Sequence, residues 1–234
     1  MQVAILAGGL GTRLGALTAR QPKSMVPVGG RPFLDHQIEL LRRHGVDEVV
    51  LCVGHLADVI RAHVGDGTRL GVRVRVSDEG DRRLGTGGAL KWAEPLLADR
   101  FFVLFGDSYL RVDYRAVMGR LEASGRRGVM VVWKNAGYEK SDVAIEGDLL
   151  TRYGAAGGEA NGGELAYVNY GVTALRRSAL AHLVPAQACS LQDAFAPLIV
   201  ARELGAFEVE ERYYEIGSPR GLEEFRHLGI GGAV

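Results

Sequence analysis

The chain carries a glycine-rich segment close to its N-terminus, with two basic residues beside it. The apolar run 3–6 leads directly into Ala7-Gly8-Gly9-Leu10-Gly11-Thr12-Arg13-Leu14, and Pro22-Lys23 follows. Glycines let backbone N–H groups approach a phosphate chain and accept the positive φ angles that such a loop needs. Arg13 and Lys23 add two cations, which a purely structural turn does not require. We therefore expect phosphate binding here; the alternative is a tight strand-to-helix turn with incidental surface charges.

Two common phosphate-binding motifs are absent from the sequence. A Walker loop needs two glycines with four residues between them, followed by Lys-Ser or Lys-Thr, and no such string occurs. A dinucleotide fingerprint needs a third glycine where Leu14 stands, and an acidic residue where the chain has Cys52-Val53-Gly54. The segment therefore predicts a phosphate-binding loop of a different kind.

Two acidic residues that follow predicted strands are candidates for binding a divalent cation. Asp107 comes directly after the apolar run 101–106, and Glu215 lies just before Gly217 and Pro219. Open α/β sheets bind ligands at the carboxyl ends of their strands, and carboxylates with phosphate oxygens form the usual Mg²⁺ site. The alternatives are a helix-capping or turn role for Asp107 and an ordinary surface turn for Glu215.

Residues 79–89 are the candidate segment for recognising a base. Gly85, Gly87 and Gly88 would let a flat ring lie against the backbone at the start of a helix. Glu79 can accept hydrogen bonds from N1–H and N2–H₂ of guanine, or one from N3–H of uracil. The guanine contact uses both carboxylate oxygens and is favoured for that reason. The alternative places Glu79 in a charged surface turn.

Alternating strand and helix patterns position these residues in the first half of the chain. This alternation predicts βαβ units and a mostly parallel sheet in an α/β fold. We expect strands at Gln2–Leu6, Glu48–Val53, 72–76, 101–105 and 129–133, and helices near 34–44, 56–63, 88–97 and Tyr114–Ser124. The helix near 34–44 has a one-sided apolar stripe and is expected to end at Gly45.

After Lys134 the pattern changes to short segments typical of antiparallel strands. These segments are 143–145, Leu149–Tyr153 and 167–175, with a flexible stretch at 154–163. Ser190 and Asp193 form a capping-box pattern that predicts a helix start. Glu215 ends a final strand, and Pro219 begins the last helix. We interpret this half as a substrate lobe packed over the sheet, not as a separate domain.

Composition limits the class of protein. The 234 residues fit one large α/β domain, and Lys+Arg and Asp+Glu are equal at 28 each, which argues against nucleic-acid or membrane-surface partners. The two cysteines fit neither a disulfide scaffold nor a zinc site. The first strand leaves no room for a signal peptide, and no apolar run approaches the ~20 residues that cross a bilayer. We expect a cytoplasmic protein.

The order and spacing of the motifs resemble those of the sugar-1-phosphate nucleotidylyltransferases. The likeness covers nearly the whole chain and rests on five motifs: 6–14 with Pro22-Lys23, Gly85-Thr86-Gly87-Gly88-Ala89, Phe105-Gly106-Asp107-Ser108, Asn169-Tyr170-Gly171, and Tyr214-Glu215-Ile216-Gly217-Ser218-Pro219. It is greatest to the small enzymes that act on heptose 1-phosphate (guanylyl transfer) or N-acetylmuramate 1-phosphate (uridylyl transfer). The resemblance implies a Rossmann-like sheet flanked by helices, with a small antiparallel substrate lobe. It divides the single domain 1–234 into a nucleotide-binding part, 1–134, and a sugar-binding part, 135–234.

The resemblance also implies a reaction and a set of site residues. A nucleoside monophosphate passes from an NTP to a sugar 1-phosphate, pyrophosphate leaves, and Mg²⁺ is the cofactor. Arg13 and Lys23 would be catalytic, Lys23 beside the attacked α-phosphate; Asp107 and Glu215 would hold the metal, and Asn169 and Gly171 would contact the sugar. The implied nucleotide-binding residues are Leu6, Ala7, Gly8, Gly9, Gly11, Thr12, Arg13, Lys23, Glu79, Gly85 and Gly88.

Two positions depart from the family's usual pattern. The family usually has aspartate where Glu215 stands, and many relatives carry Glu-Lys-Pro where this chain reads Arg152-Tyr153-Gly154. The usual lysine contact to the sugar phosphate is therefore missing or supplied by Lys134 or Arg152. The base and the sugar stay open at this point, as does the oligomeric state, for which a homodimer is one option.

The expected reaction needs no general base. A phosphate monoester has a second pKa of about 6, so it is largely a dianion at neutral pH and already a nucleophile. The protein has only to align it with the α-phosphorus. The six histidines are scattered, in keeping with this expectation. The other hypotheses are a catalytically silent nucleotide-binding subunit and a nucleotidyl transferase that acts on a molybdopterin-type or other small alcohol.

Overall fold

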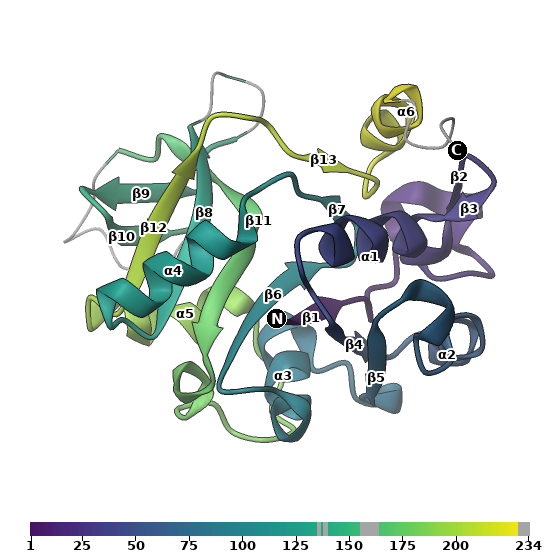
Figure 1. The fold of residues 1–234 in the computed structure, drawn as a ribbon, viewed down its shortest axis with the longest axis horizontal. Coiled ribbons are helices and arrows are strands. Elements are labelled where there is room, and N and C mark those ends of the chain that lie inside the picture. The colour runs from purple at the N-terminus through teal and green to yellow at the C-terminus, as the bar shows by residue number, and fades with distance from the viewer. Residues whose placement is uncertain (135–136, 138–139, 155–163, 229–234) are drawn as a thin grey trace.

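The computed structural model describes residues 1–134, 137, 140–154 and 164–228, and its centre is a nine-stranded sheet (Figure 1). The expected flexible stretch, apart from Gly154, lies outside the described residues. The first four strands of the sheet pair in parallel in the order β5-β4-β1-β6. They are β1 (Gln2–Leu6), β4 (Glu48–Val53), β5 (Arg73–Asp78) and β6 (Arg100–Phe105). The predicted α/β fold is confirmed.

Helices cover both faces of the sheet. Neighbouring residues of β1 belong to opposite cores, since Val3 and Ile5 pack into one apolar cluster and Ala4 into the other. The helices that bury side chains in the first cluster are α1 (Phe33–Arg43), α2 (Ala57–Val64) and α4 (Tyr114–Ser124). Those in the second are α3 (Gly85–Trp92) and α5 (Leu191–Val200). Alternate side chains of a pleated strand point to opposite faces, so both faces of the sheet are buried.

The helix ends follow from local sequence. After α1, Gly45 adopts the predicted left-handed conformation, with φ of 84°. The capping box of Ser190 and Asp193 opens α5 as predicted. In contrast, α3 ends five residues earlier than expected, and Glu94–Leu96 form a separate 3-10 turn. Pro95 has no N–H to donate and cannot continue the helix.

The second half of the chain extends the same sheet. Strand β11 (Tyr167–Arg176) pairs antiparallel with β6 and with β8 (Gly128–Lys134). The remaining strands are β12 (Leu204–Val209), β10 (Leu149–Tyr153) and β9 (Val143–Glu146), in that order to the edge. The expected lobe is therefore a lateral continuation of the sheet, not a layer packed over it. The sequence pattern missed β12, whose parallel pairing with β8 joins segments far apart in the chain.

Two short antiparallel strand pairs and one helix complete the fold. Strand β13 (Tyr214–Glu215) pairs antiparallel with β7 (Ser108–Tyr109), outside the main sheet. Strand β2 (Pro27–Val28) pairs with β3 (Arg31–Pro32), and α6 (Pro219–His227) follows β13. Within the described part of the chain, no helix combines the length and apolar character that crossing a bilayer requires.

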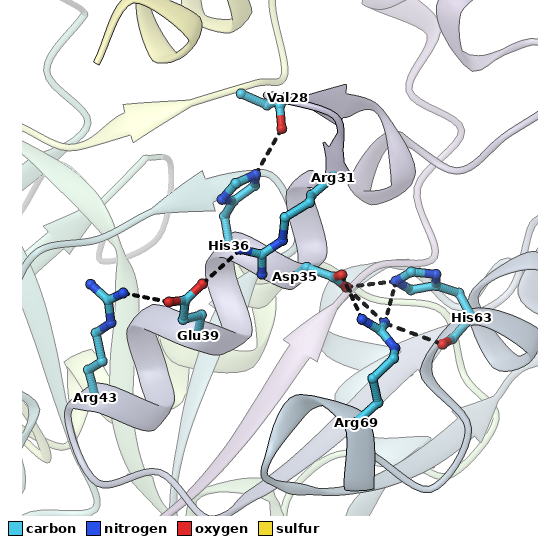
Figure 2. Close-up of polar contacts among 8 residues, drawn as sticks. All are labelled: Val28, Arg31, Asp35, His36, Glu39, Arg43, His63 and Arg69. Carbon is cyan, nitrogen blue, oxygen red and sulfur yellow. Dashed lines mark hydrogen bonds and ion pairs between the residues drawn. The ribbon is translucent and has the colours of Figure 1, made fainter. Parts of the chain in front are cut away.

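A buried polar cluster joins α1 to α2 (Figure 2). Asp35 is 2% exposed, and its carboxylate accepts hydrogen bonds from Arg69 (3.0 and 3.3 Å) and lies 2.6 Å from His63 Nε2. Burial alone raises the pKa of Asp35, but the bonds from Arg69 and His63 outweigh it and lower the pKa overall. On the outer side of α1, Glu39 pairs with Arg31 and Arg43 in water.

We expect Asp35→Asn to lower the free energy of unfolding by about 1–3 kcal/mol at pH 7, because it removes the charge that pairs with Arg69. The lowered pKa means that ionised Asp35 stabilises the fold above about pH 4, the ordinary aspartate value. The difference from the wild type should therefore shrink as the pH falls below that value. Urea unfolding followed by circular dichroism measures the free energy of unfolding of both proteins at each pH. Glu39→Gln is the control and should cost less than about 1 kcal/mol.

Candidate active site

A cavity of about 640 Å³ opens at the carboxyl ends of β1, β4 and β6. Nine of the residues predicted for the site line it: Leu6, Ala7, Gly8, Gly9, Arg13, Lys23, Glu79, Gly85 and Asp107. Six do not: Gly11, Thr12, Gly88, Asn169, Gly171 and Glu215. The glycine-rich loop and the Asp107 turn thus share one cavity, although 84 residues separate Lys23 from Asp107.

The glycine-rich loop is fixed by contacts with β4 and with Thr18, which follows it in the chain. The Ala7 N–H donates to Cys52 O (2.8 Å), and a Cβ at Gly8 would stand 3.3 Å from the backbone N of Gly54. Gly11 has φ of 64°, and its carbonyl accepts a bond from Thr18 Oγ1 (2.9 Å). Gly11 and Thr12, predicted to bind nucleotide, do not line the cavity, and Thr12 is exposed to solvent.

Four charged side chains gather beside Gly217. Lys23 Nζ forms an ion pair with Asp107 Oδ2. A Cβ at Gly217 would stand 2.5 Å from Asp107 Oδ2, 2.8 Å from Glu215 Oε2 and 3.1 Å from Arg13 Nη2. Two carboxylates and two cations therefore meet around Gly217, and of these four side chains Lys23, Arg13 and Asp107 line the cavity. A side chain at position 217 would occupy the space between them.

The pairing of β7 with β13 brings Glu215 to Asp107. Glu215 lies opposite Ser108, and the Ile216 N–H donates to Asp107 O (2.9 Å). The Glu215 carboxylate also accepts bonds from Ser218 N (3.0 Å), Ser218 Oγ and Gly217 N. It lines a neighbouring cavity of about 180 Å³ instead of the larger one.

The donor set at this end suits a hard divalent cation. Asp107 and Glu215 each place one oxygen within 3 Å of the same point, and Mg²⁺ prefers one or two carboxylates completed by water and substrate phosphates. The described residues contain no group of three or more His, Cys, Asp or Glu side chains able to hold a metal. Phosphate and water would have to supply the other ligands.

Glu79 lines the same cavity, where its carboxylate lies near Gly8 and Gly54. It is 8% exposed, and its Oε2 accepts a bond from Leu84 N (3.3 Å). Its Oε1 lies 3.0 Å from a Cβ built at Gly54 and has no hydrogen-bond donor among the residues described. Burial raises the pKa of Glu79 and the Asp78 charge adds to the effect, while the bond from Leu84 opposes it.

The glycines of α3 pack closely against the segment that precedes α5. A Cβ would stand 2.6 Å from Cys189 O at Gly85 and 2.5 Å from Gln187 O at Gly88. The N–H groups of Gly87 and Gly88 both donate to Cys189 O (2.9 and 3.2 Å). Gly85 still lines the cavity, but Gly88 lies against the segment before α5.

The two predicted sugar residues lie on β11, and their polar groups bond within the chain. Asn169 Nδ2 donates to the Tyr153 hydroxyl (2.9 Å), and Asn169 Oδ1 accepts from Gly171 N (2.9 Å). Gly171 has φ of 99°, and a Cβ there would stand 3.3 Å from Ser108 Oγ. Arg152 Nε donates to Gly154 O (3.2 Å), while Lys134 is exposed at the end of β8.

Comparisons with known proteins agree with this geometry. The family model for nucleotidyl transferases matches residues 2–141, more than half of the chain. The protein belongs to the nucleotidyl transferase family. It is 38% identical over 124 residues to a UTP–glucose-1-phosphate uridylyltransferase from Synechocystis (48% of this chain, 32% of the relative). It is 39% identical over 113 residues to a D-glycero-α-D-manno-heptose 1-phosphate guanylyltransferase from Campylobacter jejuni (48% of this chain, 50% of the relative).

Structural similarity extends over almost the whole nucleotidyl transferase. The crystal structure of HddC from Yersinia pseudotuberculosis superposes with a TM-score of 0.79 at 25% identity, covering 97% of this chain and 98% of that one. The sequence matches above, in contrast, span only half or less of the length of those two relatives.

Sequence reasoning missed two charged residues that line the cavity, Asp81 and Arg83. Arg83 is exposed, has a left-handed backbone with φ of 50°, and follows Glu79 by four residues. Among the residues described it forms no hydrogen bond or ion pair. Its place in the charged run Asp81-Arg82-Arg83 resembles an ordinary solvated turn, so no local signal distinguished it.

We expect Gly217→Ala to fold normally and to bind divalent cations about 10-fold more weakly, because the new methyl group must push the Asp107 and Glu215 carboxylates aside. Mn²⁺ titration followed by electron paramagnetic resonance measures the affinity, and thermal unfolding tests the fold. Gly119→Ala is the control, since a Cβ there meets no atom within 4 Å. Equal Mn²⁺ affinity in both variants would contradict this role for Gly217.

Proposed function

We propose that the protein transfers a nucleoside monophosphate from an NTP to a sugar 1-phosphate and releases pyrophosphate. The observation that supports this reaction best is the convergence of four charged side chains around Gly217, beside the cavity that the glycine-rich loop lines: Lys23, Arg13, Asp107 and Glu215. Transfer of a nucleotidyl group requires two polyanions to approach each other. Fixed cations beside a metal-binding carboxylate are what such an approach needs.

In this proposal the chain's own residues position charges. Arg13 binds the leaving β- and γ-phosphates, for which its planar guanidinium is suited, and Lys23 lies beside the α-phosphate. Asp107 and Glu215 hold Mg²⁺, which neutralises phosphate charge when bound. The sugar phosphate attacks in line as a dianion, so no side chain has to remove a proton. Each cation offsets a few kcal/mol of repulsion at the effective dielectric of a cleft.

The proposed donor is GTP and the proposed acceptor a heptose 1-phosphate. The Campylobacter relative carries that activity in its name, and HddC has been crystallised with GMP-PN. Glu79 supports guanine because a buried carboxylate can accept from both N1–H and N2–H₂. Arg83 adds donors for the O6 and N7 edge of the same base. Uridylyl transfer is the second candidate, favoured by the Synechocystis relative.

We expect Asp107→Asn to lower Mg²⁺-dependent pyrophosphate release by at least ~10²-fold, because it removes the charge that holds the cation. Activity is measured with four NTPs and dTTP against a panel of sugar 1-phosphates. Asp193→Asn is the matched control, since that carboxylate caps α5 outside the cavity. Full activity in Asp107→Asn would refute the metal assignment. Nucleotide binding without turnover by the wild type, across the whole panel, would favour a silent subunit.

We expect Glu79→Gln to raise the KM for GTP by about 10–100-fold and to leave the KM for UTP within about threefold, because it removes one acceptor for guanine. ITP, which lacks the N2 amino group, should lose less than GTP. Only ionised Glu79 can accept both bonds, so the wild-type KM for GTP should rise as the pH falls toward the raised pKa of Glu79. A parallel pH dependence in Glu79→Gln would contradict this assignment.

A further inference from the structure

We infer that Gln37 is a positioning residue that fixes the Asp107 turn and thereby sets the affinity for the divalent cation. Gln37 lies on α1, is 1% exposed and does not line the cavity. The inference rests on the metal-binding role of Asp107 in the proposed function. It adds a residue on α1 that contacts the turn carrying Asp107 without lining the cavity.

The side-chain amide of Gln37 bridges the turn that carries Asp107. Its Nε2 donates to Phe105 O (2.9 Å), the last residue of β6, and to Ser108 O (2.7 Å), the first residue of β7. The two carbonyls bracket Gly106 and Asp107. One rigid amide group therefore fixes both ends of a two-residue turn.

The rest of the turn is fixed by backbone contacts from two other segments. The Gly106 N–H donates to Leu6 O (2.9 Å), and Asp107 O accepts from Ile216 N (2.9 Å). Gly106 has no room for a side chain, because a Cβ would stand 2.8 Å from Leu6 O. With Gln37 included, β1, β13 and α1 hold the turn. A carboxylate on such a turn is oriented before the cation arrives.

The amide oxygen of Gln37 shows that this side chain is not there for packing alone. Gln37 Oε1 is buried without a hydrogen-bond partner among the described residues. An unsatisfied buried acceptor costs free energy, so an apolar side chain of similar shape would pack at lower cost. The two bonds from Nε2 are what offsets this cost. They end on the turn that carries Asp107 and on no other part of the fold.

A matched pair of variants separates positioning from packing. Gln37→Met keeps the volume and removes both bonds to the turn. Gln2→Met removes an amide that is also buried, at 5% exposed. Gln2 Nε2 donates to Leu96 O (3.0 Å) and its Oε1 accepts from Ala98 N (2.6 Å), and Gln2 does not line the cavity. Both variants should lower the unfolding temperature.

We expect Gln37→Met to raise the Kd for Mn²⁺, measured by electron paramagnetic resonance, about 10-fold, and the half-saturating Mg²⁺ concentration for transfer by a similar factor. Gln2→Met should leave both within about twofold. If Gln37→Met is insoluble, Gln37→Asn carries the same test, since its shorter amide cannot reach both carbonyls.

The outcomes distinguish this inference from the proposed function. Unchanged Mn²⁺ affinity in Gln37→Met, with lost affinity in Asp107→Asn, would overturn the role of Gln37 alone. Unchanged affinity in Asp107→Asn would overturn the metal assignment and this inference together. Equal losses in Gln37→Met and Gln2→Met would assign the effect to general destabilisation and also overturn the role of Gln37.

Discussion

The balance of charge around Gly217 is the constraint on which the site depends. Two carboxylates that each place an oxygen within 3 Å of one point repel each other. At a separation of about 5 Å and an effective dielectric of 20 that repulsion is ~3 kcal/mol. Lys23 and Arg13 compensate it, Lys23 through its ion pair with Asp107. The same two cations are then the ones that an incoming phosphate chain would meet.

This arrangement requires three distant segments to meet, and the backbone pairings bring them together. Lys23 lies on a 3-10 turn after the glycine-rich loop, Asp107 follows β6, and Glu215 ends β13. Parallel pairing of β1 with β6 aligns the first two segments. Pairing of β7 with β13 adds the third. The charges therefore sit on elements whose register is fixed by backbone hydrogen bonds, which keeps them at short range despite their repulsion.

Much of the fold was predictable wherever the signal is local. Strands β1 and β4 and helix α4 have the predicted bounds, because apolar runs, periodicity and the Asp113 cap determine them. Strand β12 was not predictable, since its parallel pairing with β8 joins segments about 75 residues apart in the chain. The residues of the site likewise divide into those that local sequence predicts and those that depend on tertiary contacts. Glycine-rich motifs, Lys23 and Asp107 line the cavity as expected, whereas the burial of Gln37 against the Asp107 turn depends on tertiary contacts.

The close packing of the α3 glycines against the segment that precedes α5 connects the two halves of the chain. Cys189 O accepts from Gly87 and Gly88, and Thr86 Oγ1 accepts from Leu191 N (2.8 Å) at the start of α5. These bonds use the N–H groups that a helix start would otherwise offer to a ligand. Leu84, whose N–H donates to Glu79, also accepts from Cys189 N (2.9 Å), so the turn that carries Glu79 is connected to the segment before α5. The base recognition proposed for Glu79 in one half of the chain would therefore depend on the packing of the other half.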